Sequence, residues 1–500
     1  MPTENELLTI DALMQHSGVQ FGTSGARGLA DAMTDRVCYA YTAGFLGYLA
    51  FRNEFKPGTE VAIAGDYRAS TPRIMAAAAG AIASCGGVPV NLGYLPTPAL
   101  ALFALKRGIP GVMVTGSHIP DDRNGIKFYQ PGGEILKPDE AGIRQRQVLV
   151  PGSEFDAAGM YRAPFALPAE TGAAYREYCD RYLDFFPAAC FHGLRIGLYE
   201  HSSVARDLLG EILASLGAEV VRLGYSDRFV PVDTEAIRSE DVALARQWSR
   251  QFALDALVST DGDADRPLIG DESGEWLRGD VAGVLCARYL GVRHLVTPVS
   301  SNTLVEQCGW FTQVDRTRIG SPYVIEGMQA ALSAGRRSVA GYEANGGFLL
   351  ADEVSSGSAR LSPLPTRDAV VVILAVLMLA RQQACPLSGL LALLPRRYTF
   401  SDRLKAFPSE LSQARIASMR SGDAAKDVAA VNAVFADAFG NAVKLDVTDG
   451  LRITFASHEV VHLRPSGNAP ELRCYSEADS PARAAEINRR CLAIMESWRS

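Results

Sequence analysis

The chain has 500 residues, 48% of them hydrophobic and 21% charged, and its formal net charge is −7. A chain this long exceeds what one hydrophobic core can hold, so we expect about three or four domains and the composition of an ordinary globular enzyme. The acidic balance argues against a nucleic-acid-binding protein, which usually presents a basic face, but local arginines can still bind phosphate.

The cysteines and the apolar runs bear on where the protein works. Nine cysteines are scattered through the chain without a CxxC pair, which argues against a zinc site or a disulfide framework. Reduced thiols in the cytoplasm are the simplest explanation. The N-terminus lacks the order of a signal peptide, and the longest apolar run, Ala369 to Ala380, is too short to cross a bilayer. We therefore expect a soluble, cytoplasmic protein without a membrane partner, in which this run forms a buried core helix.

The first part of the chain predicts an α/β unit that is repeated. A strand is predicted over Val61–Ala64, a helix from about Pro72 to Cys85, and a second strand from Gly87 to Leu92. Residues 81–94 (AIASCGGVPVNLGY) and 212–225 (ILASLGAEVVRLGY) are identical at seven of fourteen positions, and a strand precedes each segment. We interpret this match as a duplication.

A fainter third copy from His294 to Gly320 extends the pattern to three related α/β domains. Residues 131–170 are rich in Gly, Pro and polar residues and predict a loose boundary after the first domain. Short helices and alternating strands after Arg397 predict a smaller C-terminal α+β domain. The expected domains cover residues 1–165, 166–275, 276–395 and 396–500.

The first candidate catalytic residues follow an apolar run, Gly111–Val114, that predicts a buried strand. Ser117 and His118 come at its carboxyl end, where open α/β sheets bind ligands. Lys127 comes ten residues after the serine, beyond a loop expected over residues 121–125. The segment supplies a nucleophile, an acid and a base, although such a combination also occurs by chance in ordinary turns.

The clearest chemistry follows residues 253–260, an apolar strand that runs into an acidic loop with Asp261, Asp263 and Asp265. Three carboxylates at alternate positions repel one another unless a cation neutralises them. Ligation by oxygen alone suits Mg²⁺, especially where a phosphate completes the shell. A calcium loop of the EF-hand type fits less well, because Arg266 stands where its sharp turn needs glycine. A merely solvated acidic turn is the remaining alternative.

Three further loops have the composition of ligand sites. Phe21–Gly28 presents main-chain N–H groups and the guanidinium of Arg27, which together can line an anionic site. Residues 341–347 offer groups that suit sugar hydroxyls: Glu343, Asn345 and Gly346. A loop near the C-terminus offers groups that suit phosphate: Arg464, Ser466, Gly467, Asn468 and Arg473. Taken singly, each loop is also consistent with a plain turn.

Taken together and in this order, the loops resemble the signatures of the α-D-phosphohexomutase family. Thr115–Pro120 resembles the phosphoserine loop TASHNP, and Asp261–Arg266 resembles the metal loop DGDGDR. Glu343–Gly347 is similar to the sugar-recognition loop, and Arg464–Pro470 to the phosphate-binding loop RPSGTEP. The resemblance covers essentially the whole chain. It implies a four-domain architecture, three related α/β domains plus a smaller C-terminal α+β domain around a central cleft.

The resemblance also implies a Mg²⁺-dependent phosphohexomutase that interconverts hexose 1-phosphate and hexose 6-phosphate, with mannose preferred and glucose a close second. Ser117 would be phosphorylated and would complete the metal shell formed by Asp261, Asp263 and Asp265. A hexose 1,6-bisphosphate would serve as intermediate and activator. Four side chains would surround the phosphoryl group, with the lysine as acid/base: Arg27, His118, Lys127 and Arg266.

The remaining implications concern substrate and partners. The sugar loop would bind hydroxyls, and the Arg464 loop would hold the phosphate that is not reacting, with a hinge expected near residues 395–400. The expected partner is a small phosphosugar, with no nucleic acid, and the chain is expected to be a monomer or homodimer. The sequence departs from the family pattern at Gly116, where Ala is usual, and at Gly347, where many members have a proton-transferring His. The alternatives are a phosphoglucosamine mutase, a metal-dependent sugar-phosphate phosphatase and a catalytically silent phosphosugar-binding protein.

Overall fold

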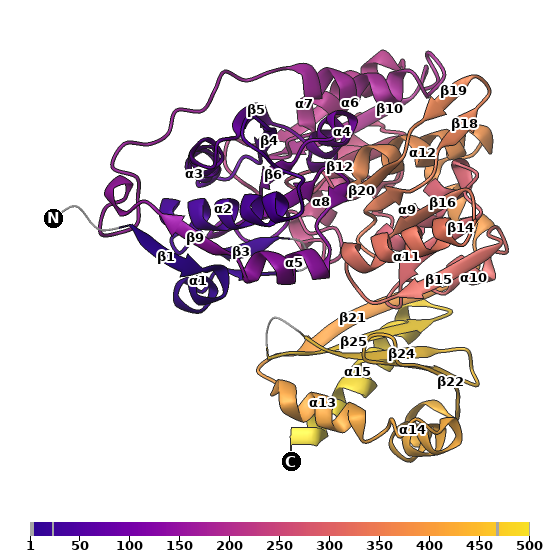
Figure 1. Cartoon of the computed structure of the whole chain (residues 1–500). Helices are drawn as coiled ribbons and strands as arrows, with labels where there is room; N and C mark the ends of the chain where they lie inside the picture. The colour runs from indigo at the N-terminus through magenta and orange to yellow at the C-terminus, as the bar shows by residue number, and fades with distance from the viewer. Residues whose placement is uncertain (1–4, 23–24, 467–469, 500) are drawn as a thin grey trace. The chain divides into compact units, whose positions relative to one another are not determined.

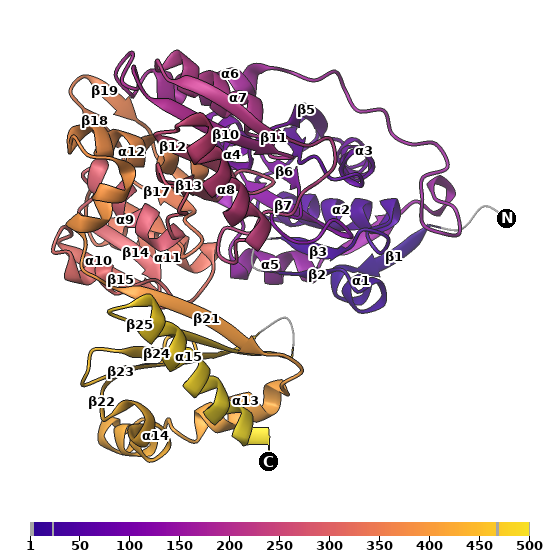
Figure 2. The same cartoon turned by 180° about the vertical axis from the view of Figure 1, so that it is seen from behind.

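The computed structural model describes residues 5–22, 25–466 and 470–499. It divides into two compact units. Unit 1 comprises Met1–His294 with Gly320–Leu391, and unit 2 comprises Leu295–Ile319 with Ala392–Ser500. Figures 1 and 2 show the chain from two opposite sides, coloured from the N-terminus to the C-terminus.

The first sheet of unit 1 has seven strands in the order β2-β3-β7-β6-β4-β5, with β8 paired to β7. Its centre is parallel: β4 (Glu60–Gly65) pairs with β5 (Val88–Tyr94) on one side and β6 (Gly111–Val114) on the other. β7 (Arg123–Gln130) is antiparallel to β6 and begins inside the loop expected over residues 121–125, so that loop is shorter than predicted. The other strands are β2 (Gln20–Phe21), β3 (Ala26–Leu29) and β8 (Gly133–Glu134).

Helices cover the faces of this sheet. α2 (Asp35–Phe51) and α3 (Thr71–Ser84) share one apolar cluster with alternate residues of β4 and β6, including Ile63 and Val112. α4 (Thr97–Arg107) contacts the same two strands, and a Cβ on Gly111 would lie 2.8 Å from Leu100 of this helix. Because side chains alternate along a strand, α4 packs on the opposite face. The parallel strands are therefore buried on both sides, which explains their short, continuous apolar sequences.

The second sheet has the order β11-β10-β12-β13. β10 (Arg195–His201) is parallel to β11 (Glu219–Tyr225) and to β12 (Ala256–Thr260), whereas β13 (Pro267–Gly270) is antiparallel to β12. The accompanying helices are α6 (Ala173–Leu183), α7 (Arg206–Ser215) and α8 (Ser239–Phe252).

The two copies seen in the sequence fall on equivalent elements, the end of α3 with β5 and the end of α7 with β11. Gly86 and Gly217, which are aligned, both have positive φ, at +82° and +94°. The aligned Gly93 and Gly224 do too, at +74° and +63°. Only glycine adopts these conformations without strain, so the repeated glycines mark the same backbone turns in both copies.

The last part of unit 1 is an antiparallel group, β16 (Val339–Tyr342), β17 (Phe348–Leu350) and β20 (Leu364–Asp368), with the hairpin β18 (Val354–Ser356) and β19 (Ala359–Leu361). Its helices are α9 (Gly279–Tyr289), α11 (Ser321–Ser333) and α12 (Ala369–Gln382), followed by the 3₁₀ helix η2 (Leu387–Leu393). The predicted core helix is confirmed, because every residue from Ala369 to Ala380 is buried. Within the described ranges, no single helix is long and apolar enough to cross a membrane, and α12 with η2 meets that test only as a pair bent by 79°.

The prediction of one loose stretch over residues 131–170 is wrong for its first half. This region contains β8, α5 (Lys137–Arg144), β9 (Gln147–Val150) and the short 3₁₀ helix η1 (Gly152–Glu154). β9 pairs with β1 (Glu6–Thr9), which leads into α1 (Ile10–Ser17). The elements are short and carry Pro or Gly at their ends, which makes their composition similar to that of a loop. Irregular chain follows from residue 155 to α6.

Unit 2 contains an antiparallel sheet in the order β21-β25-β24-β23-β22. The strands predicted after Arg397 are present: β22 (Ala442–Asp446), β23 (Leu451–Phe455) and β24 (Val460–Pro465), with β21 (Tyr398–Leu404) and β25 (Leu472–Ala478) added. Its helices, which enclose an apolar cluster with the sheet, are α13 (Ser409–Ala417), α14 (Ala424–Phe439), α15 (Pro481–Glu496) and η3 (Ser497–Arg499). The segment 295–319 contains β14 (His294–Pro298) except for its first residue, together with α10 (Leu304–Gln307) and β15 (Gln313–Thr317).

Candidate active site

Ser117 lies in a buried turn that follows β6 after two residues. Its φ is +55°, a left-handed conformation that strains a residue other than glycine. Its N–H donates to Thr115 Oγ1 at 2.7 Å, and the threonine hydroxyl donates to Asp66 Oδ2 at 2.7 Å. The Ser117 hydroxyl donates to Asp261 Oδ2 at 2.5 Å and lies 3.2 Å from His118 Nδ1. The turn therefore holds the serine hydroxyl against a carboxylate of the acidic loop.

Arg68 fixes this turn, although no sequence pattern marked it as a site residue. Its guanidinium is fully buried, lies 3.9 Å from the ring of Phe229 and pairs with Asp66 at 3.2 Å. It donates hydrogen bonds of 2.6 to 3.0 Å to four main-chain carbonyls, those of Ser117, Ile119, Pro120 and Arg123. A Cβ on Gly116 would lie 2.5 Å from Arg68 Cζ, so the alanine of the TASHNP pattern does not fit beside this arginine.

The metal loop, Asp261–Arg266, connects β12 to β13 and buries all three of its aspartates. One oxygen of each aspartate lies within 4.8 Å of the others, close enough to share one ion. Thr97 Oγ1 donates to Asp263 Oδ2 at 2.6 Å. Among the described residues, however, Asp263 Oδ1 and Asp265 Oδ1 have no hydrogen-bond partner although both atoms are buried. Buried oxygens without donors fit a hard cation such as Mg²⁺.

The electrostatics of the metal loop point to the same ligand. Burial raises the pKa of Asp261 well above its usual range, and repulsion from Asp263 and Asp265 raises it further. Burial acts on Asp265 in the same direction, but Arg367 and then Lys127 outweigh it and lower its pKa. Asp261, beside the serine hydroxyl, is therefore the aspartate of this loop whose negative charge is least compensated, and a bound cation would compensate it.

Lys127 reaches this cluster from β7, as its spacing from Ser117 suggested. Its buried ammonium lies 2.6 Å from both Asp263 Oδ2 and Asp265 Oδ2. Burial alone would lower the pKa of Lys127, but the two carboxylates outweigh burial and raise it. Lys127 is therefore held as a protonated, positively charged group.

Three guanidinium groups also converge on the site. The pKa of Arg27 is lowered to about 10, first by burial and then by repulsion from Arg266 and Arg367. Burial lowers the pKa of His118 far below its usual value, and Arg266 and Arg27 contribute to the same shift, so the imidazole is neutral. Arginines that repel one another in a buried site favour an anionic ligand, and a phosphate group satisfies that requirement.

The sugar loop, Glu343–Gly347, follows β16. Glu343 is buried, and its Oε2 accepts a hydrogen bond of 2.9 Å from Arg367. The Asn345 side-chain oxygen accepts from Gly347 N at 2.9 Å, so the side chain shapes the loop and can still donate to a ligand through its NH₂ group. Gly346 has a φ of +89°, which explains a glycine at this position.

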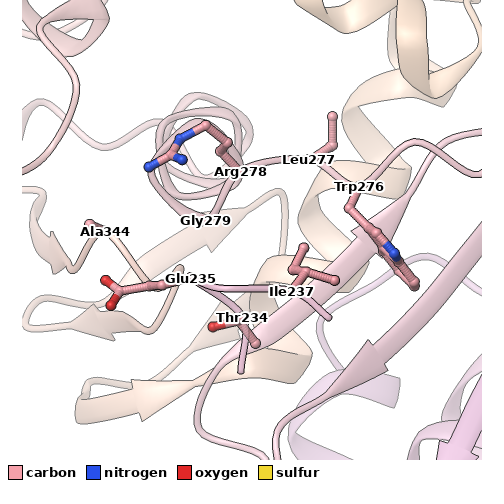
Figure 3. Close-up of a pocket in the computed structure, with 8 residues that line it drawn as sticks. All are labelled: Thr234, Glu235, Ile237, Trp276, Leu277, Arg278, Gly279 and Ala344. Atoms are coloured by element: carbon pink, nitrogen blue, oxygen red, sulfur yellow. The ribbon is translucent and has the colours of Figure 1, made fainter. Parts of the chain in front are cut away.

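A cavity of about 130 Å³ adjoins the sugar loop and is drawn in Figure 3. Its wall includes Ala344 of the loop, and Glu235 and Arg278 extend toward that side from two separate segments. The backbones are in close contact here: a Cβ on Gly279 would lie 2.4 Å from the carbonyl carbon of Asn345. The cavity thus presents a hydrogen-bond acceptor, Glu235, and a donor, Arg278, beside the sugar loop, which is expected to bind hydroxyls.

The expected phosphate-binding residues lie in unit 2, and Gly467 and Asn468 fall outside the described residues. Arg464 and Arg473 are direct cross-strand partners on β24 and β25. Arg464 Nε donates to Asp449 Oδ2 at 2.9 Å, and Arg473 lies 3.7 Å from Glu471. Ser466 N donates to the carbonyl of Glu471 at 2.9 Å. Two arginines directly opposite each other on neighbouring strands repel, so an anion bound between them is favourable.

Four family models match the chain in order. The phosphoglucomutase/phosphomannomutase alpha/beta/alpha domains I, II and III match residues 18–147, 176–274 and 278–398. The C-terminal domain of the same family matches residues 418–493.

Individual proteins match over almost the whole length. A phosphomannomutase from Sinorhizobium fredii is 44% identical over 96% of this chain and 99% of its own length. One from Salmonella muenchen is 44% identical over 97% of each chain. The crystal structure of a phosphoglucomutase/phosphomannomutase family protein from Burkholderia thailandensis superposes with a TM-score of 0.71 at 19% identity, over 95% and 97% of the two chains, and so has the same fold.

Proposed function

The chain belongs to the phosphoglucomutase/phosphomannomutase family and is an isomerase that transfers a phosphoryl group, and we propose that it interconverts mannose 1-phosphate and mannose 6-phosphate. Glucose phosphates are the second substrate pair. The observation that carries the proposal is the Ser117 hydroxyl, held 2.5 Å from Asp261 in a strained turn at the edge of a buried cluster of three aspartates. The two phosphomannomutases at 44% identity favour mannose over glucose.

We place Mg²⁺ at the oxygens of Asp261, Asp263 and Asp265, with a phosphate oxygen on Ser117 as a further ligand. The buried oxygens of Asp263 and Asp265 that accept no hydrogen bond from the described residues support this assignment. Bound Mg²⁺ would supply positive charge that neutralises the phosphoryl group during transfer.

The reaction requires a phosphoserine that passes its phosphoryl group to a sugar hydroxyl. The O–P bond to Ser117 breaks, the sugar oxygen forms the new bond, the proton of that hydroxyl passes to a base, and the released serine oxygen takes up a proton. Arg27, Arg266 and Lys127 would bind the negatively charged oxygens of the group in transit, which is most of what such a transfer needs. His118, neutral and 3.2 Å from the serine oxygen, would accept the proton of the sugar hydroxyl, and the protonated Lys127 would act as the acid that supplies one.

The bisphosphorylated sugar left after this step, a hexose 1,6-bisphosphate, must turn over before its other phosphate returns to Ser117. We propose that Glu343, Asn345 and Gly346 bind its hydroxyls, and that Glu235 and Arg278 bind those nearest the cavity of Figure 3. The phosphate that is not reacting would be held in unit 2 by Arg464, Ser466, Gly467, Asn468 and Arg473.

The test is turnover of mannose 1-phosphate and glucose 1-phosphate with Mg²⁺ and a trace of glucose 1,6-bisphosphate, recording hexose 6-phosphate and free phosphate. Ser117→Ala should abolish turnover, whereas Ser457→Ala, in an exposed turn, should not change it. Free phosphate without hexose 6-phosphate would identify a phosphatase instead. Turnover of glucosamine 1-phosphate above both other sugars would identify a phosphoglucosamine mutase. Intact mass should show one added phosphoryl group on the wild type and none on Ser117→Ala.

A further inference from the structure

Arg367 lies on β20, just before Asp368, and its side chain contacts both the metal loop and the sugar loop. Asp368 begins the buried helix α12, because its carboxylate accepts from Val370 N and Val371 N at 3.1 and 3.3 Å. The same carboxylate accepts the Tyr178 hydroxyl at 2.7 Å. The backbone that carries Arg367 is therefore fixed by a helix start and by a neighbouring tyrosine, which suits a residue that has to hold others in place.

The guanidinium of Arg367 connects the metal loop to the sugar loop. Its Nε and Nη2 donate to Asp265 Oδ2 at 3.1 and 2.6 Å, and its Nη1 donates to Glu343 Oε2 at 2.9 Å. The side chain is 3% exposed, so water does not replace these bonds. Asp265 and Glu343 thus each use one carboxylate oxygen to accept hydrogen bonds from the arginine. The other oxygen of Asp265 has no hydrogen-bond partner among the described residues, its near contact being Arg266 Nε at 3.6 Å, and is the one available to a cation.

Gly347 is the glycine that makes room for this arginine. A Cβ at position 347 would lie 2.5 Å from Cδ and 2.7 Å from Cγ of Arg367. A histidine at this position, the residue common in the family pattern, and the extended arginine therefore exclude each other. The chain has a fixed positive charge here in place of an imidazole that gains and loses protons.

We infer that Arg367 is a positioning residue that sets Asp265 for the metal and Glu343 for the sugar at the same time. The inference rests on the proposed function, since it concerns the same site. Nε and Nη2 of the guanidinium bind the metal loop, and Nη1 binds the sugar loop. One guanidinium can bind both loops because its donors lie in one rigid plane. Partners of this kind orient the ligands of a metal and strengthen its binding.

The first test measures Mg²⁺ binding by calorimetry, with no sugar present. Arg367→Met should weaken Mg²⁺ binding about tenfold, because Asp265 loses the donors that orient it. Arg367→Lys should recover part of that affinity, since an ammonium can pair with one carboxylate but does not span both. Gly347→Ala, which keeps the arginine and displaces its side chain, should change Mg²⁺ affinity in the same direction by less. Arg360→Met, in an exposed ion pair on β19, is the matched control and should bind Mg²⁺ as the wild type does.

The second test measures the KM for mannose 1-phosphate at saturating Mg²⁺. Arg367→Met should raise KM severalfold because Glu343 is no longer held, and the effect should persist when Mg²⁺ is in excess. Unchanged Mg²⁺ affinity and unchanged KM in Arg367→Met and Gly347→Ala, with only a lower melting temperature, would overturn the inference. If Arg367→Met does not fold, Arg367→Lys and Gly347→Ala decide the question by the same two measurements.

The failure of this inference is distinguishable from failure of the proposed function. A wild type that lacks mutase turnover refutes the function, while the Mg²⁺ titrations still test the contact with Asp265. A wild type that turns over hexose phosphates, with variants that bind Mg²⁺ and sugar normally, refutes only the role of Arg367.

Discussion

Replacing Arg68 with methionine should release the turn that carries Ser117 while keeping most of the buried volume. The change removes four hydrogen bonds to main-chain carbonyls and an ion pair with Asp66. Breaking a buried pair costs about 3–5 kcal/mol, and each buried acceptor left without a donor costs about 1–3 kcal/mol. These losses are not additive because they share one side chain, so we expect a destabilisation on the order of 4 kcal/mol.

Hydrogen exchange followed by mass spectrometry measures this loss locally. Peptides covering residues 115–125 should exchange faster in Arg68→Met, whereas peptides from unit 2 should not change. The phosphorylated fraction of Ser117 and the mutase rate should fall with it, since the hydroxyl no longer has a fixed position. Gly116→Ala should act in the same direction at about 1–3 kcal/mol, because its Cβ would meet the guanidinium at 2.5 Å. Wild-type exchange in these peptides, together with a wild-type rate, would refute the reasoning.

Three further changes test other parts of the site. Asp261→Asn should raise the melting temperature without metal, because burial and two neighbouring carboxylates disfavour its charge, and should abolish the gain in melting temperature that Mg²⁺ gives; a lower melting temperature without metal would contradict this. Arg278→Met should raise the KM for mannose 1-phosphate severalfold with little change in kcat, as expected for the loss of one hydrogen bond to substrate; an unchanged KM would remove the cavity from the substrate site. His201→Gln should flatten the pH dependence of stability. Burial lowers the pKa of His201 from 6.5 to about 4, so between these values the unfolded chain binds a proton that the folded chain does not. The unfolding free energy should then rise with pH across this window by up to about 3 kcal/mol in the wild type and by less in the variant, as urea titrations at pH 4.5 and 7 would measure.

The sequence predicted those parts of the site that are local in the chain. Ser117 and the three aspartates were predicted as site residues because each group comes just after an apolar strand, where open α/β sheets bind ligands, although the two strands belong to different sheets. The repeated glycines at 86 and 217 were visible because a positive φ is a property of one residue and its neighbours. Local patterns of this kind need no knowledge of distant contacts.

The residues that the sequence missed act over long separations. Arg68 contacts Ser117 from 49 residues away, and Arg367 contacts Asp265 across 102 residues. Neither arginine stands in a pattern that differs from an ordinary polar turn or strand end. The two departures from the family motifs were the available signal: Gly116 and Gly347 each lack a side chain where one of these arginines lies. A small residue in place of a larger one indicates that something else fills the space, but only the structure shows what.

Phosphorylation of Ser117 and binding of Mg²⁺ are expected to strengthen each other, because the two charges would lie side by side at the buried aspartates. The Ser117 hydroxyl is 2.5 Å from Asp261, one of the three aspartates whose oxygens can share an ion. A phosphoserine adds about 1.5–2 negative charges, and Mg²⁺ adds two positive ones, so each offsets the charge that the other brings into the buried site. Mg²⁺ should therefore bind the phosphorylated enzyme more tightly than the dephosphorylated one, and by linkage phosphorylation should be favoured by the same factor. Calorimetric titration of both forms measures this coupling, with Ser117→Ala as the form that cannot be phosphorylated. Equal Mg²⁺ affinities would show that the phosphate oxygen does not complete the metal shell.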